Sequence, residues 1–205
     1  MRVESIYAGG RLGQFPDQKP RSGNGDGFLG WLGTDLRQTI TGRLSMTVRD
    51  ALRISIDTGS YIGLGYIEDL TESEMLHRPA PKSNHIKWQL GHLIFSENWH
   101  IDLIAPNSMP PLPEGFKERY DRDKAAIDDA TAFDSRDFLL GVFAEQRERT
   151  ITLLEEFPEE QFEKETGIEY APTAAAMFSL QGSHWLMHAG QWAVIRRQLG
   201  KDPLY

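Results

Sequence analysis

Apolar residues recur at the spacing of an α-helix along four long segments of this sequence, the first of which begins near residue 47. The inward face of the first segment is made of Val48, Leu52, Ile56, Gly59, Gly63 and Ile67. That of the third is made of Leu139, Val142, Phe143, Gln146, Thr150, Leu153 and Phe157. The expected helices cover residues 47–70, 85–104, 135–157 and 173–199. Because no comparable run of alternating β-branched residues occurs, the pattern predicts an all-α fold, a four-helix bundle.

Residues that begin or end helices refine this prediction. Ser83 or Asn84 is expected to cap the second helix, and Thr173 the fourth. Gly200, with a proline shortly after it, is a typical helix stop. The connections are long, above all the roughly 30 residues between the second and third helices, so the topology need not be up-down-up-down.

The distribution of glycine separates two parts of the chain. Residues 1–45 hold nine of the nineteen glycines, and we predict that they form a disordered or non-native extension to a bundle over residues 46–205. Within the first helix, Gly59, Gly63 and Gly65 each cost about 1 kcal/mol relative to alanine. Their expected benefit is the close approach of a neighbouring helix.

Charge and composition exclude several functions. The formal net charge is −8, and an acidic protein lacks the basic surface that phosphate backbones require, so we expect no nucleic-acid partner. No apolar stretch reaches the ~20 residues of a membrane span and no signal peptide is recognisable, so a cytoplasmic protein without membrane contact is expected. The sequence has no cysteine, so thiol chemistry would need a thiol from a co-substrate.

The inward face of the fourth helix carries polar side chains among apolar ones. This face consists of Met177, Leu180, His184, His188, Gln191, Ile195 and Leu199. His184 and His188 lie one turn apart, which separates them by about 6 Å along the helix axis. Two imidazoles at that spacing can bind one ion, although the pair alone is a weak signal.

The second helix supplies a third inward histidine. Its face consists of His85, Trp88, His92, Phe95, Ser96, Trp99 and Leu103. A single buried histidine is usually a neutral core residue with a hydrogen-bond acceptor. Inward histidines on two helices, however, are all satisfied by one shared ion. We therefore predict a divalent metal site made of His92, His184 and His188.

The remaining histidines and nearby polar residues are assigned other roles. His85 lies about 10 Å along the helix from the predicted ligand, and we expect it at the helix start or at the mouth of the site. His77 is expected on the surface, and His100 is expected to be structural or exposed. Ser96 and Gln191 each lie one turn from a predicted ligand and are candidates for hydrogen bonds that orient the ligands.

A di-iron site is an alternative, because Glu74-x-x-His77 and Glu97-x-x-His100 both match the Glu-x-x-His motif of di-iron bundles. Glu97, however, points away from His92 around the helix. The first and fourth helices also offer no obvious inward carboxylate near their middle. The di-iron alternative is therefore disfavoured.

The second helix has further features outside the metal prediction. It carries a second apolar face of Ile86, Leu90, Ile94 and Ile101. Such a face is explained either by a dimer interface or by burial under the proline-rich loop that follows. Tryptophans near the site either line a substrate pocket or belong to the core: Trp88, Trp99 and Trp192.

Two motifs resemble those of the DinB/YfiT-like superfamily of metal-binding four-helix bundles. The first is Trp88-Gln89-Leu90-Gly91-His92-Leu93. The second is His184-x-x-x-His188-Ala189-Gly190-Gln191, followed by Arg196-Arg197-Gln198-Leu199-Gly200. The resemblance implies a homodimer whose three-histidine site holds zinc or nickel, with water at the open positions. Characterised relatives include thiol S-transferases and isomerases that use low-molecular-weight thiols, and hydrolase-like proteins.

These observations predict a divalent-metal-binding protein that acts as a metal-dependent enzyme, S-transferase-like or a hydrolase. Three neutral imidazoles leave the ion an open position, as in catalytic sites. The expected substrate is a small molecule, such as a low-molecular-weight thiol. The alternative is a non-catalytic, stress-related dimeric bundle that binds metal. The sequence does not distinguish zinc from nickel, since both accept imidazole.

Overall fold

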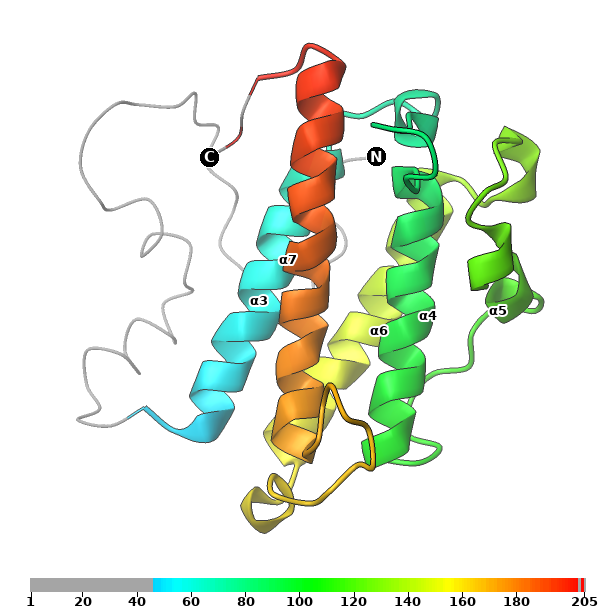
Figure 1. Cartoon of the computed structure of the whole chain (residues 1–205). Helices are drawn as coiled ribbons and strands as arrows, with labels where there is room; N and C mark the ends of the chain where they lie inside the picture. The colour runs from blue at the N-terminus through cyan, green and yellow to red at the C-terminus, as the bar shows by residue number, and fades with distance from the viewer. Residues whose placement is uncertain (1–45, 203, 205) are drawn as a thin grey trace, which may run out of the picture. The chain divides into compact units, whose positions relative to one another are not determined.

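The structure, a computed structural model, describes residues 46–202 and 204 and contains no strand in this part of the chain. Its long helices, shown in Figure 1, are α3 (Val48–Ile67), α4 (Ile86–Ile104), α6 (Arg136–Glu156) and α7 (Ala174–Gln198). The short elements are the helix α5 (Phe116–Arg119) and the 3-10 turns η2 (Glu74–Leu76), η3 (Arg122–Lys124), η4 (Ala130–Ala132) and η5 (Glu159–Gln161). The predicted all-α four-helix bundle is confirmed. The extension predicted for residues 1–45 lies outside the described residues.

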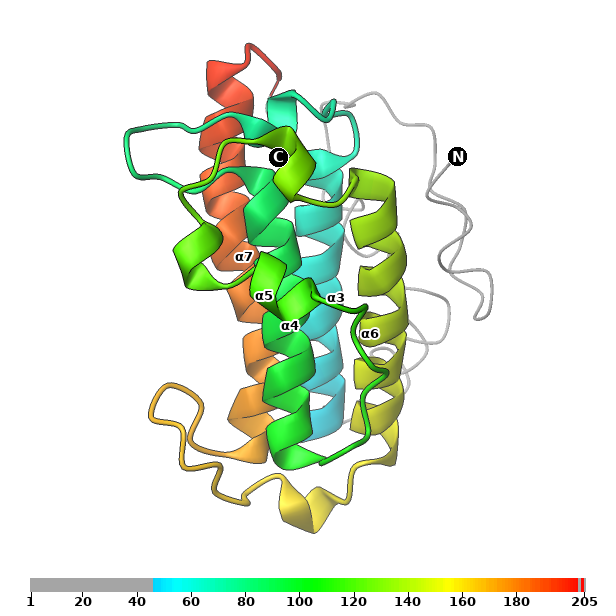
Figure 2. The ribbon, with the colours of Figure 1, turned by 90° about the vertical axis from the view of Figure 1, so that its right-hand side faces the viewer.

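The long helices are arranged so that α3 lies diagonally opposite α4, and α6 opposite α7. α3 and α4 each pack on both α6 and α7. Figures 1 and 2 show that α4 and α6 run in one direction and that α3 and α7 run in the other. α6 runs parallel to α4 because the connection over residues 105–135 returns along the length of the bundle. The topology therefore differs from up-down-up-down, as the long connections suggested.

Arginines near the helix ends fasten this arrangement. Arg49, at the start of α3, donates hydrogen bonds to the carbonyls of Leu154 and Phe157 at the end of α6. Arg196, near the end of α7, donates to the carbonyl of Tyr66 near the end of α3. Both arginines thus satisfy backbone carbonyls that the last turn of a helix leaves without a partner.

The helix caps agree with the prediction for α7 but not for α4. Thr173 caps α7, as expected, by accepting a hydrogen bond from the backbone of Ala176. The cap of α4 is His85 and neither Ser83 nor Asn84, so that prediction is wrong. His85 has an extended backbone, and its Nδ1 accepts a hydrogen bond from the Trp88 amide at 3.1 Å. The imidazole nitrogen thus takes the place of the oxygen that serine or asparagine would supply.

Helices α3 and α7 touch backbone to backbone at a pair of glycines. A Cβ added to Gly59 would lie 2.5 Å from the carbonyl oxygen of Gly182, and one added to Gly182 would lie 2.5 Å from the carbonyl carbon of Ser55. A Cβ on Gly63 would lie 2.5 Å from the Trp185 ring. The close approach predicted for Gly59 and Gly63 is confirmed. No side chain fits between the helices here. This contact therefore restricts where α7 can lie along the axis of α3.

The second apolar face of α4 is buried within the chain itself. Its four residues have no exposed surface: Ile86, Leu90, Ile94 and Ile101. Tyr120, which ends α5, packs on α4 so closely that a Cβ on Gly91 would lie 2.5 Å from the ring Cγ. Ile101 packs in the core between the long helices. Burial within the chain therefore accounts for this face, and a dimer interface is not needed for it.

Apolar side chains fill the interior between the long helices. One core cluster joins all four long helices and the segment between α6 and α7, and comprises Leu52, Ile56, Ile101, Ile104, Leu153, Leu154, Phe157, Phe162, Ala171, Ala174, Met177 and Phe178. The predicted inward faces of the first and third helices match the buried positions, except that Val48 is exposed. None of the described helices combines the length and the apolar character needed to cross a membrane.

The glycine contact predicts opposite effects for two glycines of the same helix. Gly182→Ala should destabilise the protein by about 2 kcal/mol, because the overlap with α3 outweighs the better helix propensity of alanine. Gly190→Ala, where an added Cβ meets nothing within 4 Å, should stabilise it by about 0.5–1 kcal/mol. Urea unfolding of both variants measures this, and equal effects of the two substitutions would contradict the proposed contact.

Candidate metal centre

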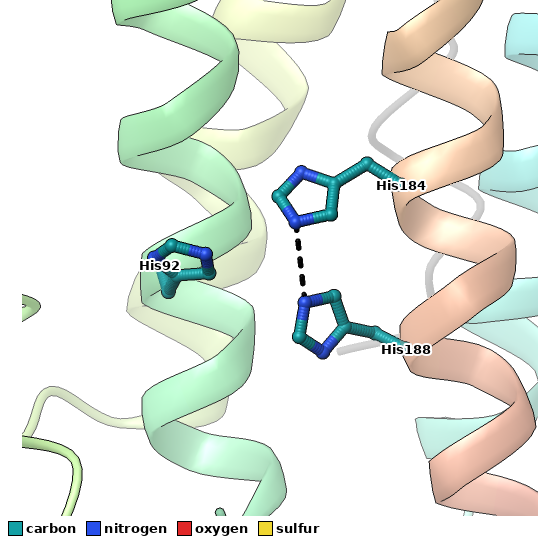
Figure 3. Close-up of side chains that lie close together, drawn as sticks. All are labelled: His92, His184 and His188. Carbon is teal, nitrogen blue, oxygen red and sulfur yellow. Dashed lines mark hydrogen bonds between the residues drawn. The ribbon is translucent and has the colours of Figure 1, made fainter. Parts of the chain in front are cut away.

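The three histidines expected to form one site lie together between α4 and α7. Figure 3 shows His92 of α4 beside His184 and His188, which project from successive turns of α7 toward α4. The Nε2 atoms of His184 and His188 are 3.2 Å apart. One nitrogen from each of the three rings lies within 4.8 Å of the others, and no other such group of three metal-binding side chains occurs among the described residues.

Aromatic contacts hold the third imidazole in place. The His92 ring stacks on Trp88, with ring centres 4.9 Å apart and planes 8° from parallel. Its ring centre lies 5.4 Å from that of His184 and 5.9 Å from that of His188. Trp88 is itself held by a hydrogen bond from its indole nitrogen to the carbonyl of Asp121. Trp88 therefore restricts the orientation of the His92 ring.

The donor set and its spacing fit a divalent ion such as zinc or nickel. A tetrahedral ion with Zn–N bonds of 2.0–2.1 Å places two ligand nitrogens about 3.3 Å apart. The 3.2 Å between the Nε2 atoms of His184 and His188 is close to this value. The donor atom of His92 lies within 4.8 Å of both, so this ring would have to move closer to complete the tetrahedral spacing. Imidazole is a common ligand of both metals.

Burial keeps the three histidines neutral near pH 7. It lowers the pKa of His92 to about 4, with a smaller effect of Arg122 in the same direction. Burial, followed by the charge of its histidine neighbours, lowers the pKa of His184 to about 3. The pKa of His188 falls to about 4, again mainly through burial. Each neutral ring therefore has a lone pair for a metal ion.

Gln89, which was not among the predicted site residues, sets the tautomer of His188. Its amide orientation is fixed, because Oε1 accepts from the Trp192 indole at 2.5 Å while Nε2 donates to the Asn84 carbonyl at 2.8 Å. Oε1 also lies 3.1 Å from His188 Nδ1. Since a carbonyl oxygen only accepts, Nδ1 carries the proton and Nε2 carries the lone pair that faces the other histidines. Metal-binding histidines are commonly oriented in this way.

The sequence contained a signal that Gln89 takes part in a buried hydrogen-bond network. The residue interrupts an apolar run three positions before His92, and a glutamine buried there must have partners. The predicted Gln191 accepts a hydrogen bond from Gln89 at 3.0 Å. In this hydrogen-bonded chain, Gln89 therefore stands between Gln191 and His188. Ser96 is buried on α4, outside this hydrogen-bonded chain. Direct contact of Ser96 or Gln191 with the metal ligands stays a prediction.

The other histidines lie outside the cluster, as expected. His85 is the helix cap described above, with Nε2 3.0 Å from the carbonyl of Ile127. His77 bonds to the side chain of Gln198 at the surface, 2.9 Å away. His100 is buried, and its ring centre lies 6.3 Å from that of His184.

The structure gives the di-iron alternative no support. Glu97 is buried in an ion pair with Arg147, with Oε2 2.8 Å from the guanidinium. The carboxylate of Glu74 accepts hydrogen bonds from the backbone and hydroxyl of Thr71 instead of facing a metal site. Both glutamates of the Glu-x-x-His motifs therefore have structural partners.

Comparison with known proteins agrees with this fold. The family described as the DinB superfamily matches residues 64–192, a range that includes all three clustered histidines. This chain belongs to the DinB superfamily. The match begins inside α3, just after Gly63, and ends inside α7, so both helices that carry the histidine cluster, α4 and α7, contribute their histidines from within the DinB region.

A solved structure resembles the DinB fold of this chain. It is described as the crystal structure of the conserved protein of locus from Enterococcus faecalis, and it superposes with a TM-score of 0.60. The two sequences are 19% identical, and the alignment covers 77% of this chain and 100% of that one. At this identity the likeness shows the shared fold alone. No similar protein was found among curated proteins.

The lowered histidine pKa values predict a pH-dependent stability of the metal-free DinB bundle. In the unfolded chain these histidines titrate near pH 6.5. Below that pH the unfolded state binds protons that the folded state excludes, so stability should fall as the pH falls. Between about pH 7 and pH 5 the loss should approach 1 kcal/mol per pH unit for each of His92, His184, His188 and His100.

Urea unfolding of metal-free protein across this range measures the effect. His100→Gln should reduce the pH dependence by about a quarter, since it removes one of four equivalent contributions. A stability that stays constant from about pH 7 to pH 5 would show that the histidines are not buried as the structure has them.

Proposed function

We propose that this DinB-superfamily protein binds one zinc or nickel ion through His92, His184 and His188 and uses it in catalysis. The observation that carries the proposal is the convergence of the three rings, with two Nε2 atoms 3.2 Å apart and all three donor atoms within 4.8 Å. Two of these rings come from α7 and one from α4, so a bound ion would also link the two helices.

The three-histidine donor set favours a catalytic site over a structural one. Structural zinc sites are usually closed by four protein ligands, whereas three ligands leave a position for water or substrate. An ion held here would bring the pKa of a bound water or thiol toward neutral. The chain's own contribution is orientation: Gln89 presents the lone pair of His188, and Trp88 restrains the ring of His92.

Two reaction classes match this proposal, thiol S-transfer and hydrolysis. Because the sequence has no cysteine, the transferred thiol would come with a low-molecular-weight co-substrate. The proposed homodimer rests on the family resemblance, because the burial of α4 is explained within one chain.

Metal analysis of the protein purified without chelating resin tests the proposal. Wild type should contain about one zinc or nickel ion per chain, and His184→Ala should lose at least about nine-tenths of it. His77→Ala, which changes a histidine at the surface, is the matched control and should keep the metal. The proposed site is wrong if His184→Ala retains the wild-type metal content.

The same preparations distinguish an enzyme from a non-catalytic metal-binding bundle. Wild type is assayed with a panel of thiols, electrophiles and ester or amide substrates. Turnover that disappears in His184→Ala but persists in His77→Ala supports catalysis at this site. Stoichiometric metal without turnover on the whole panel supports the non-catalytic alternative.

The contact between Gln89 and His188 gives a separate prediction. Gln89→Leu removes the acceptor for His188 Nδ1 and should weaken metal binding by about 10- to 100-fold. Gln89→Glu keeps an acceptor oxygen at this position and should bind metal more tightly than Gln89→Leu. Competition titration with a chelator measures both affinities. Equal affinities of the two variants would show that Gln89 does not act through His188.

A further inference from the structure

Two large aromatic side chains near the histidine cluster are exposed. Trp99, on α4, is 42% exposed, and Tyr170, on the segment between α6 and α7, is 63% exposed. Both belong to residue types that normally bury most of their surface or contact a partner. One turn after Trp99, Leu103 adds further exposed apolar surface. These side chains come from two segments that are far apart in the sequence.

A buried histidine joins these rings to the proposed metal site. The ring centre of His100 lies 5.1 Å from that of Trp99 and 6.0 Å from that of Tyr170. On its other side, His100 lies 6.3 Å from the ring of His184. An unbroken series of ring contacts therefore leads from the exposed Trp99 and Tyr170 to a proposed metal ligand. We call Trp99, His100 and Tyr170 the aromatic cluster.

The aromatic cluster is held in place by polar contacts. His100 Nε2 lies 3.3 Å from the Tyr170 hydroxyl, which positions the tyrosine although most of its surface is exposed. Its other nitrogen, Nδ1, is buried and has no hydrogen-bond partner within normal distance among the described residues. The segment that carries Tyr170 is closed at its base by an isolated β-bridge between Glu165 and Thr173. A surface ordered in this way loses little entropy when a ligand binds.

The chemistry of the aromatic cluster favours one kind of ligand group. Two of its residues are neutral aromatic side chains, and the third is a histidine that burial keeps neutral near pH 7. Flat rings at these angles and distances offer edge-to-face and offset contacts to another aromatic ring. A charged group would gain no ion pair from these three residues.

We propose that the aromatic cluster is a recognition site for an aryl group of the substrate, whose polar end reaches the metal position at His92, His184 and His188. This inference rests on the proposed function, because it requires an open metal position. It adds the substrate class: a molecule with an aromatic ring attached to the metal-binding group through a short linker. Trp99 and Tyr170 contact the ring, and His100 positions Tyr170.

Thiol binding to the cobalt-substituted full-length protein tests this inference. Thiolate binding to the metal is followed by the sulfur-to-cobalt charge-transfer absorption, and the probes are phenylmethanethiol, cyclohexylmethanethiol and ethanethiol. Wild type should bind phenylmethanethiol about tenfold more tightly than ethanethiol. It should also bind phenylmethanethiol at least about threefold more tightly than cyclohexylmethanethiol. The cyclohexyl probe separates aromatic contact from general hydrophobicity.

Substitutions then locate the preference. Trp99→Ala and Tyr170→Ala should each weaken phenylmethanethiol binding by about 5-fold and leave ethanethiol binding unchanged. Phe138→Ala is the matched control, since Phe138 is an equally exposed aromatic residue, at 43%, on α6. It should change neither affinity.

The outcomes separate this inference from the proposed function. If ethanethiol binds to the metal but the phenyl probe has no advantage, or if the advantage survives both Trp99→Ala and Tyr170→Ala, the aryl site is wrong and the open metal site stands. If no thiol gives a charge-transfer band in the cobalt-loaded wild type, the open thiol-binding position is wrong as well.

Discussion

The backbone contact between α3 and α7 at Gly59 and Gly182 is the constraint on which the histidine cluster depends. With no Cβ on either residue, the two helices meet without intervening side chains, and a shift of α7 along α3 would push a side chain into this contact. His184 and His188 follow Gly182 by two and six residues, so their position is fixed with that of the helix. α4 meets α7 through rings instead, which leaves space between these two helices for imidazoles.

Two buried polar networks flank the cluster and offset the cost of placing polar groups inside a small bundle. On one side, Gln89 satisfies His188 and Trp192 and connects them to the start of α4. On the other, the Arg147 guanidinium pairs with Glu97 and reaches backbone carbonyls of α3 and α7. Between them, His184 bonds to His188 and His92 is held by ring contacts, and burial keeps the three imidazoles neutral. A divalent ion would satisfy these neutral donors together.

The order of the helices brings together segments that lie far apart in the chain. α4 and α7 are neighbours because α3 lies diagonally opposite α4 and α6 opposite α7. The long connection over residues 105–135 makes this order possible and also covers the outer face of α4 through Tyr120. The connection between α6 and α7 ends next to α4, where it places Tyr170 against His100. Both connections therefore contribute to the surroundings of the site.

The sequence alone determined the four helices and the three histidines, because helical periodicity shows which residues share a face and a spacing of four places two imidazoles side by side. It did not determine which helices are neighbours, since the connections are long enough to permit several orders. Only the tertiary structure showed that Gln89 bonds to both His188 and Gln191, and that His100 joins exposed rings to the cluster. Such contacts depend on the rotation and height of one helix against another, which the periodicity of a single helix does not contain.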